Sequence, residues 1–198
     1  MANIGIMGGT FNPIHYAHLL IAQSAYEQLN LDKVLFITGG NPPHKDNKPI
    51  IDAIIREEMV RASICDNPNF EICSYETEKK EYSYTAETLE YLKLNQPEDN
   101  FFFIIGADSL AYLEKWYKPE KIAELATIAV YGRENLDTYA LADRILSFFD
   151  AKIVIIDAPQ FDISSSLIRK RISEGKSIKY MVPEAAVKII EDKRLYRK

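Results

Sequence analysis

Two histidines three positions apart follow the first apolar run of the chain. His15 and His18 lie in the segment 8–18, which reads GGTFNPIHYAH and leads into a predicted helix. The adjacent glycines, Gly8 and Gly9, let the main chain turn sharply and approach a phosphate closely. Residues at i and i+3 share one helix face, and the first turn of a helix presents main-chain N–H groups. The segment therefore predicts an anion site with two imidazoles.

Two other interpretations of these residues involve a metal or a different nucleotide loop. A histidine pair suits half of a zinc site, but a third ligand is needed, and the one further histidine, His44, has no cysteine beside it. We therefore expect no metal held by the protein itself. The segment does not match the dinucleotide-binding pattern G-x-G-x-x-G. Before Gly175-Lys176-Ser177, Lys170 stands where a phosphate-binding loop requires glycine, so we interpret this tripeptide as a helix end.

A run of hydroxyl groups precedes a predicted helix near the other end of the chain. Ser164, Ser165 and Ser166 are followed by Arg169 within the predicted helix at 165–173. Serines at a helix N-terminus cap main-chain N–H groups or donate to an anion, and a guanidinium suits phosphate. Taken alone, the run is typical of a capped surface helix. Two such loops in one chain favour a phosphate site.

The elements that must position these loops alternate along the chain. Short apolar runs predict strands at 4–7, 34–38, 70–73, 101–105, 127–131 and 153–156. Helical spacing predicts helices at 18–29, 51–64, 85–94, 111–125, 139–149, 165–173 and 183–192. Strands this apolar are buried on both faces, so we expect an α/β fold with a parallel sheet of about six strands and helices on both faces. Ligands of such sheets bind beyond the carboxyl ends of the strands.

Length and charge bound the class of protein. The 198 residues suit a single domain, 1–198, with a C-terminal helical portion at about 163–198. A net charge of -5 disfavours a nucleic-acid partner. Two cysteines without a C-x-x-C pair indicate a reducing compartment. No leader and no membrane-spanning apolar run are evident, so we expect a cytosolic protein without a membrane partner, either a monomer or a homo-oligomer.

The two loops resemble the two signatures of the nucleotidyltransferase superfamily. Segment 8–18 is similar to G-x-F-x-P-x-H-x-G-H, with Ala17 in place of the usual glycine, and segment 163–169, ISSSLIR, is similar to I-S-S-T-x-I-R. The resemblance implies a Rossmann-like fold, ATP as a substrate with Mg²⁺ bound to it, and release of pyrophosphate. It also implies catalytic roles for His15 and His18, and ATP binding by Gly8, Gly9, Thr10, Phe11, Ser164, Ser165, Ser166 and Arg169.

The middle of the chain resembles nicotinate mononucleotide adenylyltransferases within that superfamily. The similarity rests on NPPHK at 41–45, SYT at 83–85, GADS at 106–109 and LEKWY at 113–117. It implies that the mononucleotide is bound by Asn41, His44, Lys45, Thr85, Asp108, Tyr112 and Trp116. Phosphopantetheine enzymes usually have threonine in place of His15, which counts against that branch.

The resemblance implies transfer of AMP from ATP to nicotinate mononucleotide, giving deamido-NAD and pyrophosphate in NAD biosynthesis. The mononucleotide phosphate would attack the α-phosphorus of ATP in line, without a covalent enzyme intermediate. His15 and His18 would donate to the α-phosphate, while Lys45 and Arg169 hold phosphates. The choice between nicotinate and nicotinamide mononucleotide stays open, because main-chain N–H groups can hold a carboxylate without a side-chain signature. A sensor that binds ATP without turnover is the alternative.

Overall fold

The computed structural model describes residues 1–40, 50–79, 82–132 and 137–197, which contain a six-stranded sheet. The strands are β1 (Asn3–Gly9), β2 (Lys33–Thr38), β3 (Phe70–Ile72), β4 (Asn100–Gly106), β5 (Ala126–Tyr131) and β6 (Ile153–Ile156). They pair in the order β3-β2-β1-β4-β5-β6, and every pair is parallel. The predicted parallel α/β sheet is confirmed, and each predicted run forms a strand.

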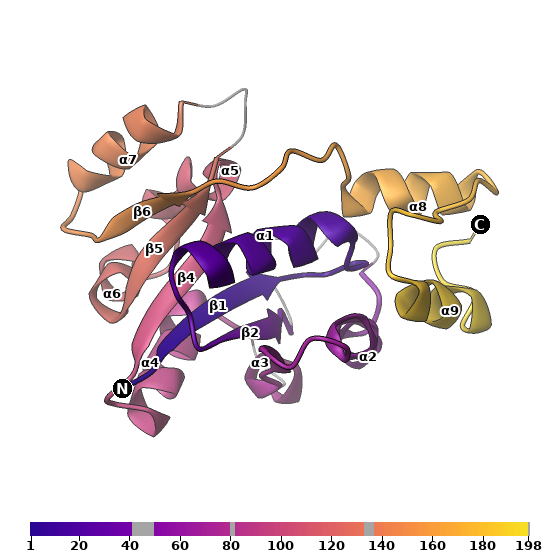
Figure 1. Cartoon of the computed structure of the whole chain (residues 1–198), viewed down its shortest axis with the longest axis horizontal. Coiled ribbons are helices and arrows are strands. Elements are labelled where there is room, and N and C mark those ends of the chain that lie inside the picture. Colours follow the sequence, from indigo (N-terminus) through magenta and orange to yellow (C-terminus); the bar gives the residue numbers. More distant parts are fainter. Residues whose placement is uncertain (41–49, 80–81, 133–136, 198) are drawn as a thin grey trace.

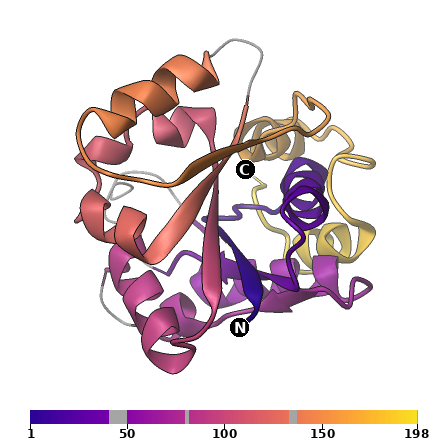
Figure 2. The ribbon, with the colours of Figure 1, turned by 60° about the vertical axis from the view of Figure 1, so that its left-hand side comes forward.

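Helices cover both faces of this sheet. They are α1 (Tyr16–Gln28), α2 (Ala53–Ile64), α3 (Tyr75–Glu78), α4 (Thr85–Asn95), α5 (Ala107–Leu110), α6 (Pro119–Leu125), α7 (Thr138–Leu146), α8 (Ser165–Ser173) and α9 (Glu184–Asp192). Figure 2 shows α1, α8 and α9 on one side of the strands and α4, α6 and α7 on the other. Successive residues of a strand point to opposite faces. In β2, accordingly, Phe36 packs in the core cluster of one face and Leu35 in that of the other.

The helix predicted at 111–125 is wrong in its first half. A 3-10 turn at Leu113–Lys115 is followed by α6, which begins only at Pro119. Proline has no N–H to continue a helix, and its ring disfavours helical geometry in the residue before it. Lys118 takes a left-handed φ of 49° at this break. The interruption places Trp116 in extended backbone outside any helix.

The C-terminal helices lie at one end of the molecule, opposite α7 (Figure 1). Between β6 and α8 the chain runs from one end to the other, and α9 then packs against α2. This crossing brings α8 next to the loop after β1, although their residues are more than 150 positions apart. In the four described ranges, no helix has the length and apolar character needed to cross a membrane.

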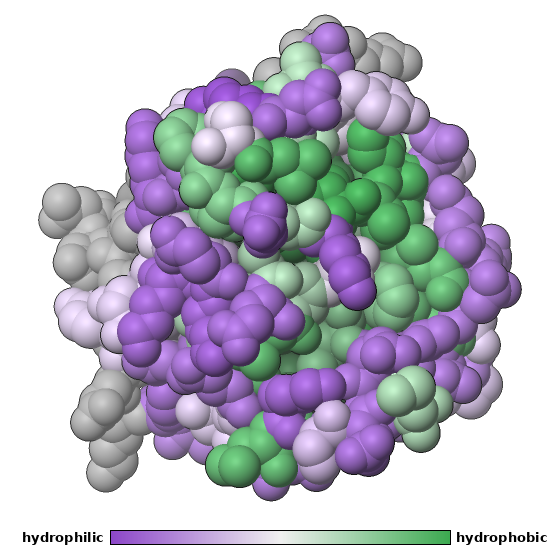
Figure 3. Space-filling view, turned by 90° about the vertical axis from the view of Figure 1, so that its left-hand side faces the viewer, coloured by the Kyte–Doolittle hydropathy of each residue, from purple (hydrophilic) through white to green (hydrophobic). Residues whose placement is uncertain are grey.

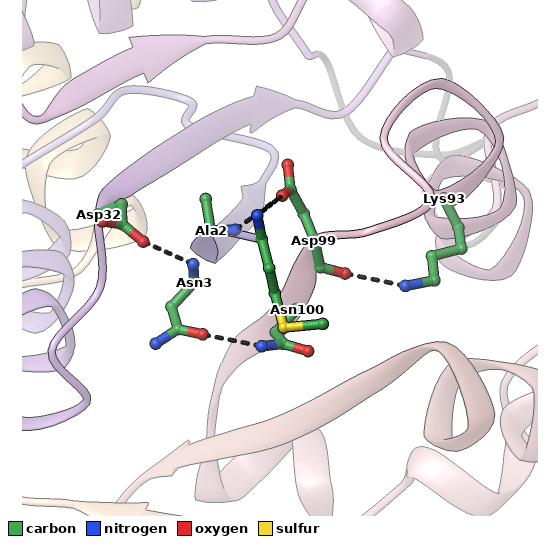
Figure 4. A network of polar contacts seen from close by, with 7 residues as sticks. Ala2, Asn3, Asp32, Lys93, Asp99 and Asn100 are labelled. Atoms are coloured by element: carbon green, nitrogen blue, oxygen red, sulfur yellow. Dashed lines mark hydrogen bonds and ion pairs between the residues drawn. The ribbon is translucent and has the colours of Figure 1, made fainter.

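Polar contacts tie together the amino ends of β1 and β4 (Figure 4). The main-chain N–H of Ala2 donates to Asp99 at 2.7 Å, and the Asn100 side chain donates to that of Asn3 at 3.0 Å. The Asn3 N–H donates in turn to Asp32 at 2.7 Å. These bonds fix the register of the central strands at the end of the sheet opposite to the loops after β1 and β4.

An apolar surface lies on the side of the molecule away from α8 and α9. Figure 3 looks onto the side that carries α7 and β6, where apolar side chains gather in a hollow ringed by hydrophilic ones. Residues of the two elements, with neighbours from β4 and β5, line a cavity of about 740 Å³. Its side chains include Tyr139 and Leu146, which are exposed, and Val154 of the edge strand. None of these residues was predicted to bind a substrate.

Candidate active site

A cavity of about 510 Å³ lies at the carboxyl ends of β1 and β4. The strand order reverses between these two strands, and such a switch point is where open α/β sheets bind ligands. Several predicted residues from separate loops line this cavity together, namely Gly8, Gly9, Thr10, His18, Thr85, Asp108 and Trp116. The structure therefore brings both predicted halves of the site, the ATP loop and the mononucleotide segments, to one cavity.

His15 and His18 stack on one another at the start of α1. His15 is the N-cap residue, and the two ring centroids lie 3.7 Å apart. The main-chain N–H of His15 donates to Nδ1 of His18 at 3.2 Å. A neutral imidazole whose Nδ1 accepts a hydrogen bond carries its proton on Nε2. His18 therefore offers one N–H donor, at Nε2.

Burial keeps His18 neutral. Desolvation lowers the pKa of His18 well below its usual value, and the neighbouring His15 lowers it further. Phe11 contributes to this apolar setting, since its ring meets that of His18 edge-on with 5.1 Å between centroids. His15 and Phe11 are both buried and lie outside the cavity wall, whereas His18 is part of that wall. Of the two predicted catalytic histidines, His18 lines the cavity and His15 packs against it.

Helix α8 and the segment after α9 hold the first loop, which we define as residues 8–15. The Ser165 hydroxyl donates to the carbonyl of Pro13 at 2.8 Å, and Arg169 donates to the carbonyl of Asn12 at 2.8 Å. The Tyr196 hydroxyl donates to the Asn12 side chain at 2.8 Å, and burial raises the pKa of Tyr196, so it keeps its proton. Two predicted phosphate ligands, Ser165 and Arg169, thus contact the loop itself.

The other serines of the α8 loop cap the helix or support the arginine. Ser164 is the N-cap and accepts the main-chain N–H of Leu167 at 3.2 Å. Ser166 accepts a second bond from Arg169 at 3.1 Å. These residues flank the first loop and lie outside the cavity wall.

Arg56 of α2 holds the first loop from the opposite side. Only 1% of Arg56 is exposed, and its Nη1 donates to the Thr10 carbonyl at 2.6 Å. Its Nη2 donates to the Gly40 carbonyl at 3.0 Å, and its Nε to the Ile51 carbonyl at 2.7 Å. Arg56 is not among the site residues predicted from the sequence. An arginine on the buried helix face formed by Met59, Val60, Ser63 and Ile64 is the signal that could have found it.

Glu76 lines the half of the cavity next to α4 and was also missed. The Thr88 hydroxyl donates to Glu76 at 2.7 Å, and the Gly40 main-chain N–H hydrogen-bonds the same carboxylate. Burial raises the pKa of Glu76, although these two bonds oppose the shift. Glu76 lies in the short helix α3, which no periodic pattern predicted.

The start of α4 presents an open helix N-terminus to this half of the cavity. Tyr84 is its N-cap but makes no side-chain cap bond, and Tyr84 and Thr85 both line the cavity. The Tyr84 and Tyr117 rings lie 4.4 Å apart beside it. Trp116 lines the cavity too and packs edge-on against Phe103, with 6.1 Å between centroids. Main-chain N–H groups of a first helical turn next to aromatic rings suit a flat, anionic ligand.

The remaining predicted residues fall elsewhere. Tyr112 is 60% exposed and is not part of the cavity wall. Asn41, His44 and Lys45 lie outside the described residues. Across the part of the chain that the structure describes, no group of three or more His, Cys, Asp or Glu side chains could hold a metal ion.

Comparison with known proteins gives one consistent family. Residues 6–171 match the family model described as cytidylyltransferase-like. A relative from Clostridium botulinum (strain Alaska E43 / Type E3), named "Probable nicotinate-nucleotide adenylyltransferase", is 44% identical over 200 residues, which cover 100% of this chain and 99% of the relative. A relative of the same name from Lachnoclostridium phytofermentans is 41% identical over 188 residues, covering 93% and 94%.

Solved structures share the fold. The nicotinic acid mononucleotide adenylyltransferase of Plasmodium falciparum complexed with NaAD superimposes with a TM-score of 0.80 at 23% identity, covering 99% of this chain and 98% of that one. The same enzyme complexed with APC gives a TM-score of 0.78 at 22% identity, with the same coverage. At this level of identity the likeness concerns the fold.

Proposed function

The chain belongs to the cytidylyltransferase-like family, and we propose that it is a nicotinate-nucleotide adenylyltransferase. It transfers AMP from ATP to nicotinate mononucleotide, giving deamido-NAD and pyrophosphate in NAD biosynthesis. The observation that carries this proposal is the cavity at the switch point. It combines a glycine-rich loop and a neutral histidine donor with an open helix N-terminus and the single tryptophan.

The reaction is a displacement at phosphorus. An oxygen of the mononucleotide 5′-phosphate forms a bond to the α-phosphorus of ATP while the bond from that phosphorus to the pyrophosphate oxygen breaks. His18 donates from Nε2 to the α-phosphate as charge develops on its oxygens, and removing one such donor costs about 10²–10³ in kcat in other enzymes. His15 supports it, because its main-chain N–H fixes the His18 tautomer. The protein transfers no proton in this step.

The first loop and α8 form the ATP side of the site. The carbonyls of Thr10, Asn12 and Pro13 accept bonds from protein side chains, which keeps them turned toward the protein. We assign the loop N–H groups and the Gly8-Gly9 turn to the phosphates of ATP, with Arg169 and Ser164 to Ser166 at the flank. Phe11 supports the loop from within the core.

The mononucleotide occupies the side next to α4. The first-turn N–H groups at Thr85 hold the nicotinate carboxylate, Trp116 stacks on the pyridine ring, and Asp108 meets the ribose. This arrangement favours nicotinate over nicotinamide mononucleotide, because an open helix N-terminus attracts an anion more strongly than a neutral amide. Asn41, His44 and Lys45 stay predictions for the mononucleotide phosphate, and Tyr112 for its outer edge.

Mg²⁺ bound with ATP would neutralise phosphate charge during the displacement. Among the described residues, the carboxylates on the cavity wall are Asp108 and Glu76, and Glu76 already accepts bonds from Thr88 and Gly40. Mg²⁺ commonly keeps several waters and relies on substrate phosphates. The donor set therefore fits an ion that ATP carries in, held by phosphate oxygens and water.

We also propose that the chain works as one domain, 1–198, with α8 and α9 as its C-terminal part. Side chains of this part hold the loop after β1, so the catalytic cavity depends on both. A cytosolic location fits the two cysteines, Cys65 and Cys73, which are free thiols.

Pyrophosphate release tests the proposal. The purified protein receives ATP and Mg²⁺ with nicotinate mononucleotide, nicotinamide mononucleotide or phosphopantetheine in parallel. We expect turnover with nicotinate mononucleotide to exceed the other two by at least about tenfold, the ratio that 1.4 kcal/mol of differential binding gives. Turnover with phosphopantetheine alone, or ATP binding without any turnover, would refute the assigned substrate.

A further inference from the structure

We propose that Arg56 is a positioning residue that sets the spacing of the main chain at Thr10 and at Gly40 and thereby the placement of both substrates. The inference rests on the proposed function, since it concerns the same cavity. Arg56 is not part of the cavity wall, so its effect must pass through the main chain that it holds.

The pairing of β1 with β2 ends next to the two main-chain carbonyls that Arg56 binds. The Gly39 N–H donates to the Gly9 carbonyl at 2.8 Å, which extends the pairing of β1 with β2 by one residue. Beyond that bond the two chains leave the ladder. The Thr10 carbonyl on one and the Gly40 carbonyl on the other then accept bonds from the same guanidinium. The guanidinium of Arg56 therefore bridges the two chains at Thr10 and Gly40, directly beyond the end of the ladder.

The planar guanidinium fits this task. Three of its nitrogens donate to three carbonyls on three segments, with the Ile51 bond anchoring the group to the start of α2. Arginine presents its donors in a fixed fork, whereas a lysine ammonium is a point charge on a flexible stem. A buried charge is weak evidence for stability, because desolvation offsets much of its attraction to partners. The geometry thus points to position more than to stability.

Gly40 connects Arg56 to the residues on the mononucleotide side of the cavity. Its carbonyl is held by Arg56 and its N–H by Glu76, which also accepts the Thr88 hydroxyl. A Cβ on Gly40 would lie 2.1 Å from the Glu76 carbonyl oxygen, so no side chain fits there. Thr88 lies one turn after Thr85 on α4. The chain of bonds from Arg56 through Gly40 and Glu76 to Thr88 therefore sets the position of the N-terminus of α4 relative to the first loop.

The test compares Arg56→Lys with Arg61→Lys. Arg61 is on the same helix, but its side chain is 60% exposed and forms an ion pair with Glu57 at 2.8 Å. Each variant is measured for kcat, for the KM of ATP and of nicotinate mononucleotide, and for urea unfolding. Titrations followed by calorimetry and by Trp116 fluorescence give dissociation constants that need no turnover.

We expect Arg56→Lys to fold and to raise the KM of both substrates, with kcat lower by about 10–100-fold, because a shift of about 1 Å can cost 100-fold in rate. Arg61→Lys should stay within about twofold of wild type, as surface changes usually do. A folded Arg56→Lys protein with kcat and both KM values within about twofold of wild type would overturn the proposal.

Glu76→Ala keeps the proposal testable if Arg56→Lys does not fold. This variant removes the acceptor of both the Gly40 N–H and the Thr88 hydroxyl. We expect a rise of about tenfold in the KM of the mononucleotide with little change for ATP, whose loop is still held by Arg56. Equal effects on both substrates, or none, would overturn the proposal. Wild-type protein that releases no pyrophosphate refutes the proposed function instead, and ATP affinity then tests Arg56.

Discussion

Two substitutions of His18 separate its contribution to folding from its contribution to catalysis. Nδ1 of His18 accepts the His15 N–H at 3.2 Å, while Nε2 carries the proton that we assign to the α-phosphate. In His18→Asn, the amide oxygen can take the place of Nδ1, but no donor reaches the place of Nε2. In His18→Gln, the longer amide reaches the place of Nε2 and leaves the His15 N–H without this acceptor.

The two variants are expected to differ in opposite directions: His18→Gln is the less stable protein, and His18→Asn is the slower enzyme. Both lose the stacked ring pair, which contributes about 0.5–1.5 kcal/mol. His18→Gln also loses a helix cap, so its free energy of unfolding should lie about 1 kcal/mol below that of His18→Asn. His18→Asn loses the phosphate donor, and its kcat should fall about 10²–10³-fold. His18→Gln should retain at least about tenfold more activity than His18→Asn, because an amide N–H still donates.

Pyrophosphate release at saturating substrates and urea unfolding of the same preparations measure the two effects. Thermal unfolding gives a second measure of stability, because a difference of 1 kcal/mol moves the thermal midpoint of a protein of this size by about 2–4 °C. The assigned role of His18 is refuted if His18→Asn is the faster enzyme, or if both variants keep wild-type kcat. It is also refuted if both are unfolded, since His18 would then be a structural residue.

Three further predictions concern other parts of the site. Trp116→Ala should raise the KM of nicotinate mononucleotide about tenfold and leave that of ATP unchanged, because base–aromatic stacking contributes about 1–3 kcal/mol; an unchanged KM for the mononucleotide would show that Trp116 does not stack on the pyridine ring. Tyr196→Phe should lower the free energy of unfolding by about 1 kcal/mol, since it removes the 2.8 Å bond to Asn12, and kcat should fall several-fold; wild-type kcat would show that Asn12 needs no support. The lowered pKa of His18 means that the unfolded chain takes up a proton first as the pH falls below about 6.5. Stability is therefore present above that pH and lost as the pH falls through the folded-state pKa; urea unfolding at pH 7.5 and 5.5 should show this loss in wild type and less of it in His18→Asn.

Local sequence patterns were sufficient to predict most of the strands and helices of the fold. All six strands were predictable because a parallel sheet buried on both faces requires apolar residues at every position of a strand. The helix at 111–125 failed because apolar spacing alone carried that prediction, whereas Pro119 and the left-handed Lys118 interrupt the helix. The short helices α3 and α5 have four residues each, too few to produce a periodic signal.

The lining of the cavity was predictable where its residues lie in contiguous motifs. The first loop, the start of α4 and Trp116 all meet at one cavity, as the motifs indicated. Arg56 and Glu76 were missed because their partners are main-chain groups or side chains brought close only by folding. Tyr196 reaches Asn12 across 184 positions, and no local pattern reports such a contact.

The side chains that hold the first loop are synthesised long after the loop itself. Ser165 and Arg169 bond to carbonyls that precede them by 152 and 157 positions. At a synthesis rate of about 5–20 residues per second, the loop leaves the ribosome on the order of 10 s before these donors do. During that interval β1, β2 and β4 can already pair, but the carbonyls of Asn12 and Pro13 lack the two donors that hold them in the folded protein. Catalytic competence is thus acquired late in synthesis, after most of the sheet exists.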